Sequence, residues 1–340
     1  MKIRNIAIIA HVDHGKTTFV DQLLKKSGTF RDNEQVSTRV MDSNDIEKER
    51  GITILAKTTS IHYDGYKINI LDTPGHADFG GEVERIMNMV DGVMLLVDAY
   101  EGTMPQTRFV LKKALEAGIK PIIVINKVDK PTARIEKVLD EVIDLFIELG
   151  ASDEQLDFKV AYVSALNGTA SLNPDISTQS ESYDDIFKLI IDEIPEPNVD
   201  NWENLQFQPA LLDYNEYVGR IGIGKIHSGR IKVNEMVSCV RLDGSIKQFR
   251  IQKLFGFDGL KRIEITEAEA GDIVAVAGLM DISVGETICD IGKEKALPIL
   301  RIDEPTLKMT FMTNNSPFVG REGKIVTARK IGERLFKETQ

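Results

Sequence analysis

Short apolar, β-branched runs alternate with helical patterns through the first half of the chain. The intervening segments place apolar residues at spacings of three and four, which puts them on one face of a helix, as in residues 79–90 and in residues 135–146 before Gly150. Strands that alternate with helices predict a mostly parallel sheet with helices on both faces. The predicted strands are residues 3–10, 67–71, 92–97, 121–125 and 159–163.

One further strand departs from this alternation. Residues 60–64 form a short strand pattern that Asp64 and Gly65 join to the next strand. An Asp-Gly pair between two apolar runs is a strong hairpin signal, so we predict an antiparallel edge strand here.

Two polar segments interrupt the pattern. Residues 29–53 are long and weakly periodic, which is typical of a functional or mobile loop. Residues 168–182 are rich in Ser, Thr, Asn and Asp and lead into a helical pattern over residues 183–194. Prolines 195 and 197 then disfavour further helix and predict a linker.

The second half of the chain has a different pattern. From residue 207 to about residue 291, short strands are separated by Gly-containing turns, which predicts a small antiparallel β-barrel. A strand-like segment at residues 307–312 and a helical pattern at residues 325–336 follow, too little to bury a core of their own. We therefore predict three units: residues 1–197, the barrel at 198–297, and the incomplete beginning of a third, ferredoxin-like α+β domain at 298–340.

Composition favours a soluble, folded, cytoplasmic protein. Apolar residues make up 42% and charged residues 28% of the 340 residues, and every apolar run is far shorter than the roughly 20 residues of a membrane helix. The amino terminus lacks a cleavable signal pattern. Cys239 and Cys289 have no partners at metal-ligand spacing, so reduced thiols are expected rather than a disulfide framework or a zinc site.

The charge distribution limits the kind of nucleic-acid contact. A net charge of −11 argues against a protein that wraps nucleic acid over its whole surface. Residues 298–340, however, carry eight Lys or Arg against five Asp or Glu, a local balance of +3. Any RNA-facing surface is therefore expected near the carboxyl end.

A phosphate-binding loop follows the first predicted strand. The sequence from Ala10 to Thr17 lies between a strand and a helix, the context in which backbone N–H groups wrap a phosphate. In such a loop Lys16 reaches the β- and γ-phosphates and the Thr17 hydroxyl ligates Mg²⁺. The alternative is an ordinary strand-to-helix turn with an exposed lysine, and Ala10 stands where the first glycine of the pattern is usual.

Two further strand ends carry suitable chemistry. Asp72 can hold Mg²⁺ through water, and the amide of Gly75 can sense the γ-phosphate. Asp129 can accept hydrogen bonds from the two N–H donors on the Watson–Crick edge of guanine, a donor pair that adenine lacks. Asn126 can tie the base and the loops together, and the Lys127 stem can lie across the purine ring.

The end of the last strand can complete the site. A backbone N–H in Ser164, Ala165 or Leu166 can meet the guanine O6. Taken singly, each motif has a structural alternative, such as helix capping by Asn or Asp. The motifs follow one another along the chain in this order, and all lie at the carboxyl ends of strands of one sheet. Together they predict a guanine-nucleotide site.

With these motifs in place, the chain resembles the translational GTPases. The resemblance extends over all 340 residues and implies a P-loop GTPase domain, GTP as substrate and GDP as product, and Mg²⁺ as cofactor. The residues that carry it are 10–18, 40–54, 72–85, 104–108 and 303–306.

The resemblance also implies roles that the pattern alone does not. Thr53 resembles the loop threonine that closes on magnesium, and His76 resembles the histidine that orients the attacking water. Val12 and Ile52 correspond to the apolar gate that keeps this histidine away before a trigger arrives. Asp13 corresponds to a position that holds a monovalent cation in some relatives.

The resulting assignment covers the whole site. The predicted GTP-binding residues are Asp13, His14, Gly15, Lys16, Thr17, Thr18, Gly75, Asn126, Lys127, Asp129, Ser164, Ala165 and Leu166. The predicted catalytic residue is His76, and the predicted magnesium residues are Thr17, Thr53 and Asp72. For the ring of His14, as for that of His11, packing and loop shape are preferred to a metal site.

The same resemblance implies a ribosomal setting. No arginine occupies a recognisable finger position, and such a charge contributes about 10³ to 10⁵ in rate, so slow hydrolysis with stimulation by the ribosome is expected. The family continues into further ribosome-facing domains, so we expect weakened ribosome docking by this chain, which is expected to be a monomer. A link to stress adaptation and regulation by ppGpp are further expectations.

Two other functions are compatible with these motifs. One is a binding module that docks when GTP is bound and hardly hydrolyses it. The other is a general elongation or back-translocation factor, which residues 79–83 and 106–110 disfavour because they resemble a ribosome-associated branch of the family. Asp129 disfavours an ATP enzyme.

Overall fold

A seven-stranded sheet organises the first half of the chain. The structure is a computed structural model that describes residues 2–28, 56–74, 80–200, 202–215, 217–299, 307–321 and 327–338. The strands of the first sheet lie in the order β2-β3-β1-β4-β5-β6-β7. Their bounds are β1 Lys2–Ala10, β2 Lys57–Tyr63, β3 Tyr66–Asp72, β4 Gly92–Asp98, β5 Pro121–Asn126, β6 Val160–Ser164 and β7 Thr169–Ser171.

The central strands of this sheet are parallel and its edge strands are antiparallel. β1 pairs in parallel with β3 and β4, β4 pairs with β5, and β5 pairs with β6. The edge strands β2 and β7 pair antiparallel with β3 and β6. Parallel strands end at the same edge of a sheet, so the loops after β1, β3, β4, β5 and β6 lie close together.

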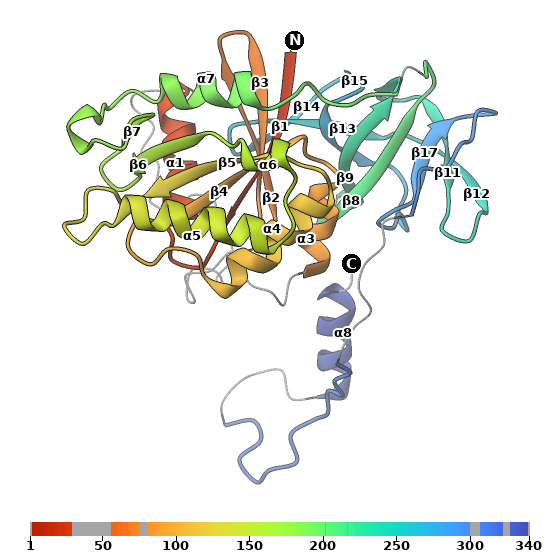
Figure 1. The fold of residues 1–340 in the computed structure, drawn as a ribbon. Coiled ribbons are helices and arrows are strands. Elements are labelled where there is room, and N and C mark those ends of the chain that lie inside the picture. Colours follow the sequence, from red (N-terminus) through yellow and green to blue (C-terminus); the bar gives the residue numbers. More distant parts are fainter. Residues whose placement is uncertain are drawn as a thin grey trace.

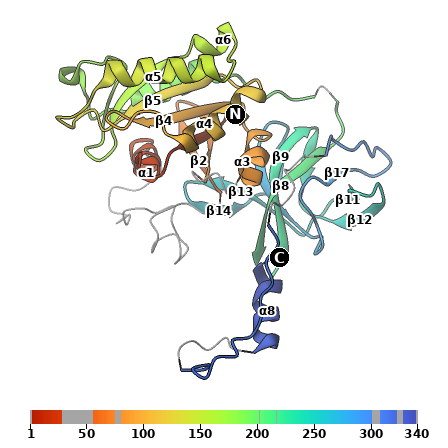
Figure 2. The same cartoon turned by 60° about the horizontal axis from the view of Figure 1, so that its bottom comes forward.

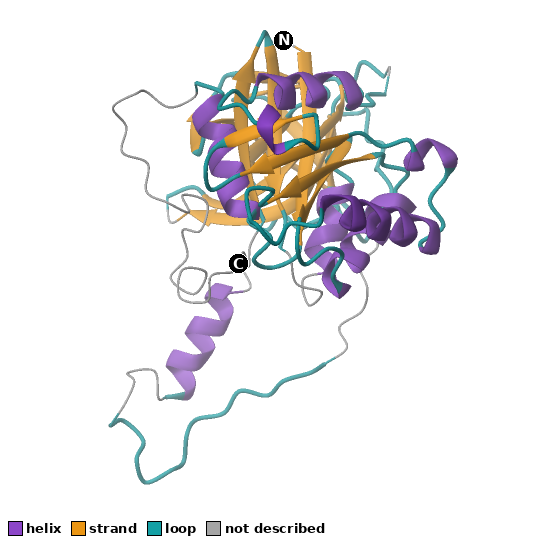
Figure 3. Ribbon diagram, turned by 60° about the vertical axis from the view of Figure 1, so that its left-hand side comes forward, coloured by secondary structure: helices purple, strands orange, loops and turns teal. Residues whose placement is uncertain are grey.

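Helices cover both faces of the sheet (Figures 1 and 3). Alternate residues of β1 face opposite ways: Ile8 belongs to the buried cluster of Phe19 and Phe187, and Ile9 to that of Leu111 and Phe146. The predicted α/β fold, a mostly parallel sheet with helices on both faces, is therefore confirmed. The helices are α1 Lys16–Lys26, α3 Gly80–Met87, α4 Pro105–Glu116, α5 Ile135–Glu148, α6 Asp153–Leu156 and α7 Asp184–Glu193.

The predicted hairpin is present between β2 and β3. Asp64 and Gly65 have φ values of 46° and 78°, the left-handed conformations that a tight two-residue turn requires. The polar segment predicted as a loop at residues 168–182 instead contains β7 and a short 3₁₀ turn at Ile176–Thr178. β7 carries no apolar alternation and is held by its ladder with β6, so periodicity gave no signal for it.

An antiparallel sheet organises the next part of the chain (Figure 2). Its order is β12-β11-β17-β8-β9-β16-β13-β14, and β10 pairs separately with β15. Its core includes Phe207, Val237 and Ile288. The predicted antiparallel all-β unit is confirmed. The strands are β8 Gln206–Asn215, β9 Gly219–Ser228, β10 Arg230–Lys232, β11 Met236–Val240, β12 Ile246–Arg250, β13 Lys253–Asp258, β14 Lys261–Glu264, β15 Glu267–Glu269, β16 Ile273–Ala277 and β17 Thr287–Asp290.

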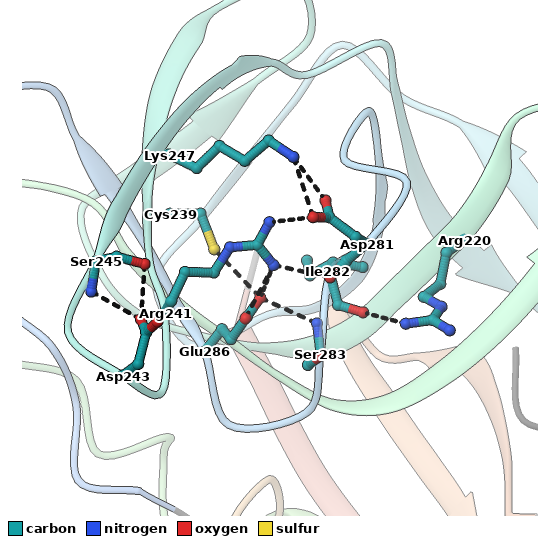
Figure 4. Close-up of polar contacts among 10 residues, drawn as sticks. All are labelled: Arg220, Cys239, Arg241, Asp243, Ser245, Lys247, Asp281, Ile282, Ser283 and Glu286. Carbon is teal, nitrogen blue, oxygen red and sulfur yellow. Dashed lines mark hydrogen bonds and ion pairs between the residues drawn. The ribbon is translucent and has the colours of Figure 1, made fainter.

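A buried carboxylate joins β11 to the connection between β16 and β17 (Figure 4). Glu286 accepts hydrogen bonds from Arg241 Nη1 at 2.9 and 3.0 Å and from the Ser283 backbone at 3.0 Å. Hydrogen bonds from Arg241 and Lys247 lower the pKa of Asp281 to about 2. Burial, together with the Glu286 charge, raises the pKa of the free Cys239 thiol to about 12. This thiol is therefore unreactive at neutral pH.

The carboxyl-terminal segment makes few contacts with the two sheets. Residues 307–312, predicted as a strand, form no strand in the structure. A strand needs a neighbour for its ladder, and Leu307 and Met312 are 84% and 80% exposed. The predicted helix is present as α8 Ala328–Glu338, which projects from the body of the molecule (Figures 1 and 2). Among the described helices, none is long and apolar enough to cross a membrane.

The contact between the two sheets contains polar side chains beside an apolar cluster that both sheets share. The Asn5 amide donates to the Gly271 carbonyl at 2.9 Å and to Asp91 Oδ2 at 2.8 Å. The other oxygen of Asp91 lies 2.7 Å from Nζ of Lys225 on β9, and both charged side chains are buried. The amino-terminal ends of β1 and β4 are thus connected to the second sheet.

The β2–β3 hairpin makes the second set of contacts. Lys67 Nζ lies 2.8 Å from both oxygens of Asp272, and the Asn69 amide donates to the same carboxylate at 3.1 Å. On the other strand of the hairpin, Ser60 and Gly259 exchange backbone hydrogen bonds at 3.4 and 2.8 Å. Both strands of the hairpin are therefore bonded to the second sheet.

We predict that Asp272→Ala destabilises the protein by about 3 kcal/mol, because it leaves the buried Lys67 ammonium without its counter-ion. Urea unfolding followed by circular dichroism measures this change. The control is Asp258→Ala, whose partner His62 is 3.9 Å away and about half exposed; its expected effect is below about 0.5 kcal/mol. Equal losses in the two variants would contradict the buried ion pair.

Candidate nucleotide-binding site

The loop between β1 and α1 has the geometry of an anion-binding turn. Asp13 and Gly15 have φ values of 65° and 89°, and α1 begins at the next residue, Lys16. The described part of the chain supplies no side-chain cap to this helix start. Its first backbone N–H groups therefore remain available to an anion, and the helix dipole favours negative charge there.

Gly15 lies directly against the loop that follows β5. A Cβ atom at this position would stand 2.5 Å from the side-chain nitrogen of Asn126. The left-handed φ and the close approach both require glycine here. The two loops are thus packed together at Gly15.

The end of β3 holds the loop lysine. Nζ of Lys16 lies 2.8 Å from Oδ1 of Asp72 and also donates to the carbonyl of Thr73. Thr73 is fixed in turn by a hydrogen bond from its hydroxyl to the Ile8 carbonyl at 2.8 Å. The Lys16 and Asp72 side chains are 9% and 0% exposed, so a cation and a carboxylate face each other in a buried setting.

Asn126 connects three loops through its side-chain amide. Its Nδ2 donates to the His14 carbonyl at 2.8 Å. Its Oδ1 accepts from the backbone N–H of Lys127 at 2.8 Å and of Ala165 at 3.0 Å. A single buried amide therefore fixes the loops after β1, β5 and β6 relative to one another.

Lys127 reaches back over the first loop. Its φ is 65°, and its Nζ donates to the Asp13 carbonyl at 2.7 Å. The same Nζ lies 2.6 Å from Oδ2 of Asp98 at the end of β4. Asp129 follows this lysine by two residues in the sequence, and its side chain is exposed.

The loop after β6 presents backbone and hydroxyl groups to the same edge. Ser164 is buried, and its hydroxyl has no hydrogen-bond partner among the described residues. Ala165 is bonded to Asn126, while its carbonyl accepts from the Gln22 amide of α1 at 2.9 Å. Leu166 is 83% exposed.

His14 is a buried part of the loop framework. Its Nδ1 accepts from the backbone N–H of Asp98 at 3.3 Å, and its Nε2 lies 3.2 Å from a Glu101 oxygen. Burial, with a contribution from His11, lowers the pKa of His14, so the imidazole is neutral at pH 7. This agrees with the expected packing role of the ring, while the backbone of His14 remains part of the predicted binding loop.

The structure brings together the described members of the predicted site. The loop with Val12 and Asp13, the first turn of α1 with Thr17 and Thr18, and the end of β5 with Asn126 converge at one edge of the sheet. Four predicted residues lie outside the described residues: Ile52, Thr53, Gly75 and His76. Sequence reasoning missed Asp98, although it occupies a strand end as Asp72 and Asn126 do.

The donor set fits a magnesium nucleotide. Thr17 and Asp72 offer the oxygen ligands that Mg²⁺ prefers, and the helix start offers N–H groups for phosphate. The described residues contain no group of three or more His, Cys, Asp or Glu that could hold a metal ion without other ligands.

Comparison with known proteins identifies the family. Residues 1–196 match the model of the elongation factor Tu GTP binding domain, and residues 219–289 match that of elongation factor Tu domain 2. The chain belongs to the elongation factor Tu GTP-binding domain family. The resemblance to translational GTPases is thereby confirmed. The first matched region contains all strands of the first sheet, and the second contains most strands of the second sheet but not β8.

Relatives within the elongation factor Tu GTP-binding domain family are similar over nearly the whole chain. The large ribosomal subunit assembly factor BipA of Bacillus subtilis is 66% identical over 99% of this chain and 55% of its own length. BipA of Escherichia coli K12 is 56% identical over 99% of this chain and 55% of its own. BipA of Synechocystis is 54% identical over 100% of this chain and 57% of its own. The chain thus spans little more than half the length of these relatives.

A solved structure supports the fold. A crystal structure of a protein from Thermus thermophilus superposes with a TM-score of 0.67 at 18% identity, covering 89% of this chain and 56% of that one. At this identity the likeness concerns the fold alone.

We predict that Gly15→Ala costs about 3 kcal/mol of stability, through the left-handed φ and through displacement of the Asn126 amide from its bond to His14. The matched control is Gly118→Ala, which has a φ of 74° but nothing within 4 Å of the added Cβ; about 1 kcal/mol is expected. Denaturant unfolding of both variants measures the difference. Identical costs would show that Asn126 does not constrain this loop.

Proposed function

We propose that this chain binds GTP with Mg²⁺, hydrolyses it slowly, and acts at the ribosome as an assembly or translation factor. The observation that carries the proposal is the buried Asn126 side-chain amide. It fixes three loops relative to one another: the phosphate loop after β1, the loop with Asp129 after β5 and the loop that begins at Ser164 after β6. The family match over residues 1–196 supports GTP as the nucleotide.

The proposed binding roles follow from the chemistry of the loops. Backbone N–H groups from Asp13 to Thr18 bind the phosphates, and Lys16 supplies the positive charge. Asp129 accepts the two guanine donors, and the backbone of Ser164–Leu166 meets the guanine O6. The Lys127 stem lies across the purine ring, held at its end by the Asp13 carbonyl.

The proposed magnesium residues are Thr17, Thr53 and Asp72. When bound, Mg²⁺ neutralises phosphate charge and orients the β- and γ-phosphates. In the structure the buried Asp72 carboxylate is balanced by Lys16 at 2.8 Å. Nucleotide binding would therefore exchange this ion pair for contacts of each partner with the magnesium nucleotide, which keeps both charges compensated.

The proposed catalytic step places a water in line with the γ-phosphate. His76 orients this water, the Gly75 amide senses the γ-phosphate, and Val12 and Ile52 form the apolar gate. Without an arginine finger the rate of hydrolysis by the isolated protein is expected to be low. The ribosome supplies the trigger in this proposal.

The ribosomal role is supported by the relatives, which are named as large ribosomal subunit assembly factors. We propose that the GTP form of this chain docks on the ribosome and that hydrolysis ends docking, with a role in stress adaptation.

Three finer features complete the proposal. The exposed Asp13 side chain contributes to a monovalent-cation site beside the nucleotide, and ppGpp competes for the guanine and 5′-phosphate contacts. The protein acts as a monomer.

We predict that Asp129→Asn exchanges guanine for xanthine specificity. An amide accepts from N1–H and donates to the C2 carbonyl of xanthine, whereas guanine presents two donors. The affinity for GDP should fall at least about tenfold and that for XDP should rise. Competition against fluorescent GDP and XDP measures both, with Asp140→Asn on the exposed side of α5 as the control. Unchanged preference for GDP would remove Asp129 from the base site.

We predict that ribosomes accelerate GTP hydrolysis and that His76→Ala abolishes the acceleration while GDP binding persists. Phosphate release is measured with and without 70S ribosomes and isolated large subunits, with ATP as the nucleotide control. His62→Ala, an exposed histidine on β2, is the matched variant and should behave as wild type.

The outcomes of this experiment separate the candidate functions. Normal hydrolysis by His76→Ala would exclude His76 as the catalytic residue. GTP binding without hydrolysis under any condition would favour a GTP-gated docking module over an enzyme. Absence of GTP binding by the wild type would refute the proposed function.

A further inference from the structure

Asp98 is a buried carboxylate at the edge where the nucleotide loops meet. It ends β4 and lies in register with Asn126 at the end of β5. Its Oδ1 accepts the backbone N–H groups of Tyr100 and Glu101 at 2.7 and 3.2 Å. These bonds fix the carboxylate, which has no exposed surface, in one orientation.

The loop after β5, which carries Lys127 and Asp129, is called the base loop here. The second oxygen of the Asp98 carboxylate is directed at one side chain of this loop. Oδ2 lies 2.6 Å from Nζ of Lys127, whereas Nζ of Lys130 is 3.8 Å away. Burial by itself would raise the pKa of Asp98, but the hydrogen bonds from Lys127 and from the backbone hold it below its usual value. The group is therefore a carboxylate throughout the neutral range.

Both the backbone and the ammonium group of Lys127 are held in place. Its left-handed backbone donates its N–H to the Asn126 side chain, and its ammonium donates to the Asp13 carbonyl and forms an ion pair with Asp98. A free lysine side chain has about 2 kcal/mol of rotamer entropy to lose on binding. Fixing the ammonium between two acceptors removes much of that cost before a ligand arrives.

The backbone of Asp98 extends the same connection to the phosphate loop. Its N–H donates to the buried ring of His14 at 3.3 Å. The carboxylate of one residue thus fixes the base loop, while its N–H contacts the phosphate loop. A residue used only to end β4 would not require a charge directed at Lys127.

We propose that Asp98 is a positioning residue for guanine-nucleotide binding. It holds the Lys127 stem extended over the place of the purine, and it keeps the base loop and the phosphate loop in fixed relative positions. This inference rests on the proposed function, in which Lys127 lies across the purine ring. It assigns no contact between Asp98 and the nucleotide itself.

The test compares two aspartates at opposite ends of β4. Asp98→Asn keeps an oxygen for Tyr100 and Glu101 but removes the charge that holds Lys127. Release of fluorescent GDP from the 340-residue chain is then measured by stopped flow, and a rate at least about tenfold above wild type is expected. Asp91→Asn is the matched control, because it also breaks a buried lysine pair, at 2.7 Å from Lys225, but remote from the site.

Three further readouts separate positioning from a general loss of stability. Asp98→Asn should accelerate release no further in a Lys127→Ala background. The single-turnover rate of hydrolysis of bound GTP should stay within about twofold of wild type, because Lys127 lies at the base. Thermal unfolding should show Asp98→Asn to be no less stable than Asp91→Asn.

The possible outcomes are distinct. If wild type binds no GDP, the proposed function itself fails. If wild type binds GDP and Asp98→Asn releases it at the wild-type rate, the inference is overturned. Additive effects of Asp98→Asn and Lys127→Ala, or equally fast release from Asp91→Asn, would overturn it as well.

Discussion

Three loops from distant parts of the chain meet at the side-chain amide of Asn126. This one group satisfies a carbonyl of the first loop and two backbone N–H groups of the others, all in a buried setting. Any other arrangement of the loops would leave some of these buried polar atoms unpaired, which costs about 1–3 kcal/mol for each. The close approach of Gly15 follows from the same constraint, since the amide can reach the His14 carbonyl only over a residue without a side chain.

The sequence indicated which loops meet at this edge of the sheet, because strand ends are visible in a hydrophobic pattern. Lys16, Asp72, Asn126 and Ser164 each stand at or just beyond an apolar run, and parallel strands bring such positions to one edge. Which of these groups bond to one another could not be predicted, because pairing depends on side-chain directions within a few ångströms. Asp98 was overlooked for this reason: its charge acquires a role only through Lys127, 29 positions further along the chain.

The misassigned elements show where local pattern gives way to tertiary context. Residues 169–171 are polar and carry no strand signal, yet β6 offers them an unpaired edge and they form β7. Residues 307–312 have the stronger β-pattern, yet they lie exposed, pair with no strand of the described ranges and form none themselves. The short helix α6 did have a local signal, the Ser152–Gln155 capping box, which a search based on apolar periodicity passes over.

The contact between the two sheets combines charge with burial, and this decides which relative motions it permits. When ion pairs such as Lys67–Asp272 and Lys225–Asp91 separate, water solvates both partners, but separation also exposes the apolar side chains of the cluster that both sheets share. A slip of one residue along the same surface is different, since it would leave a charge buried opposite an apolar or like-charged group. Both motions therefore cost free energy, separation through exposed apolar surface and sliding through mispaired charge. The β2–β3 hairpin, bonded on both strands, helps to set the single alignment of the two sheets.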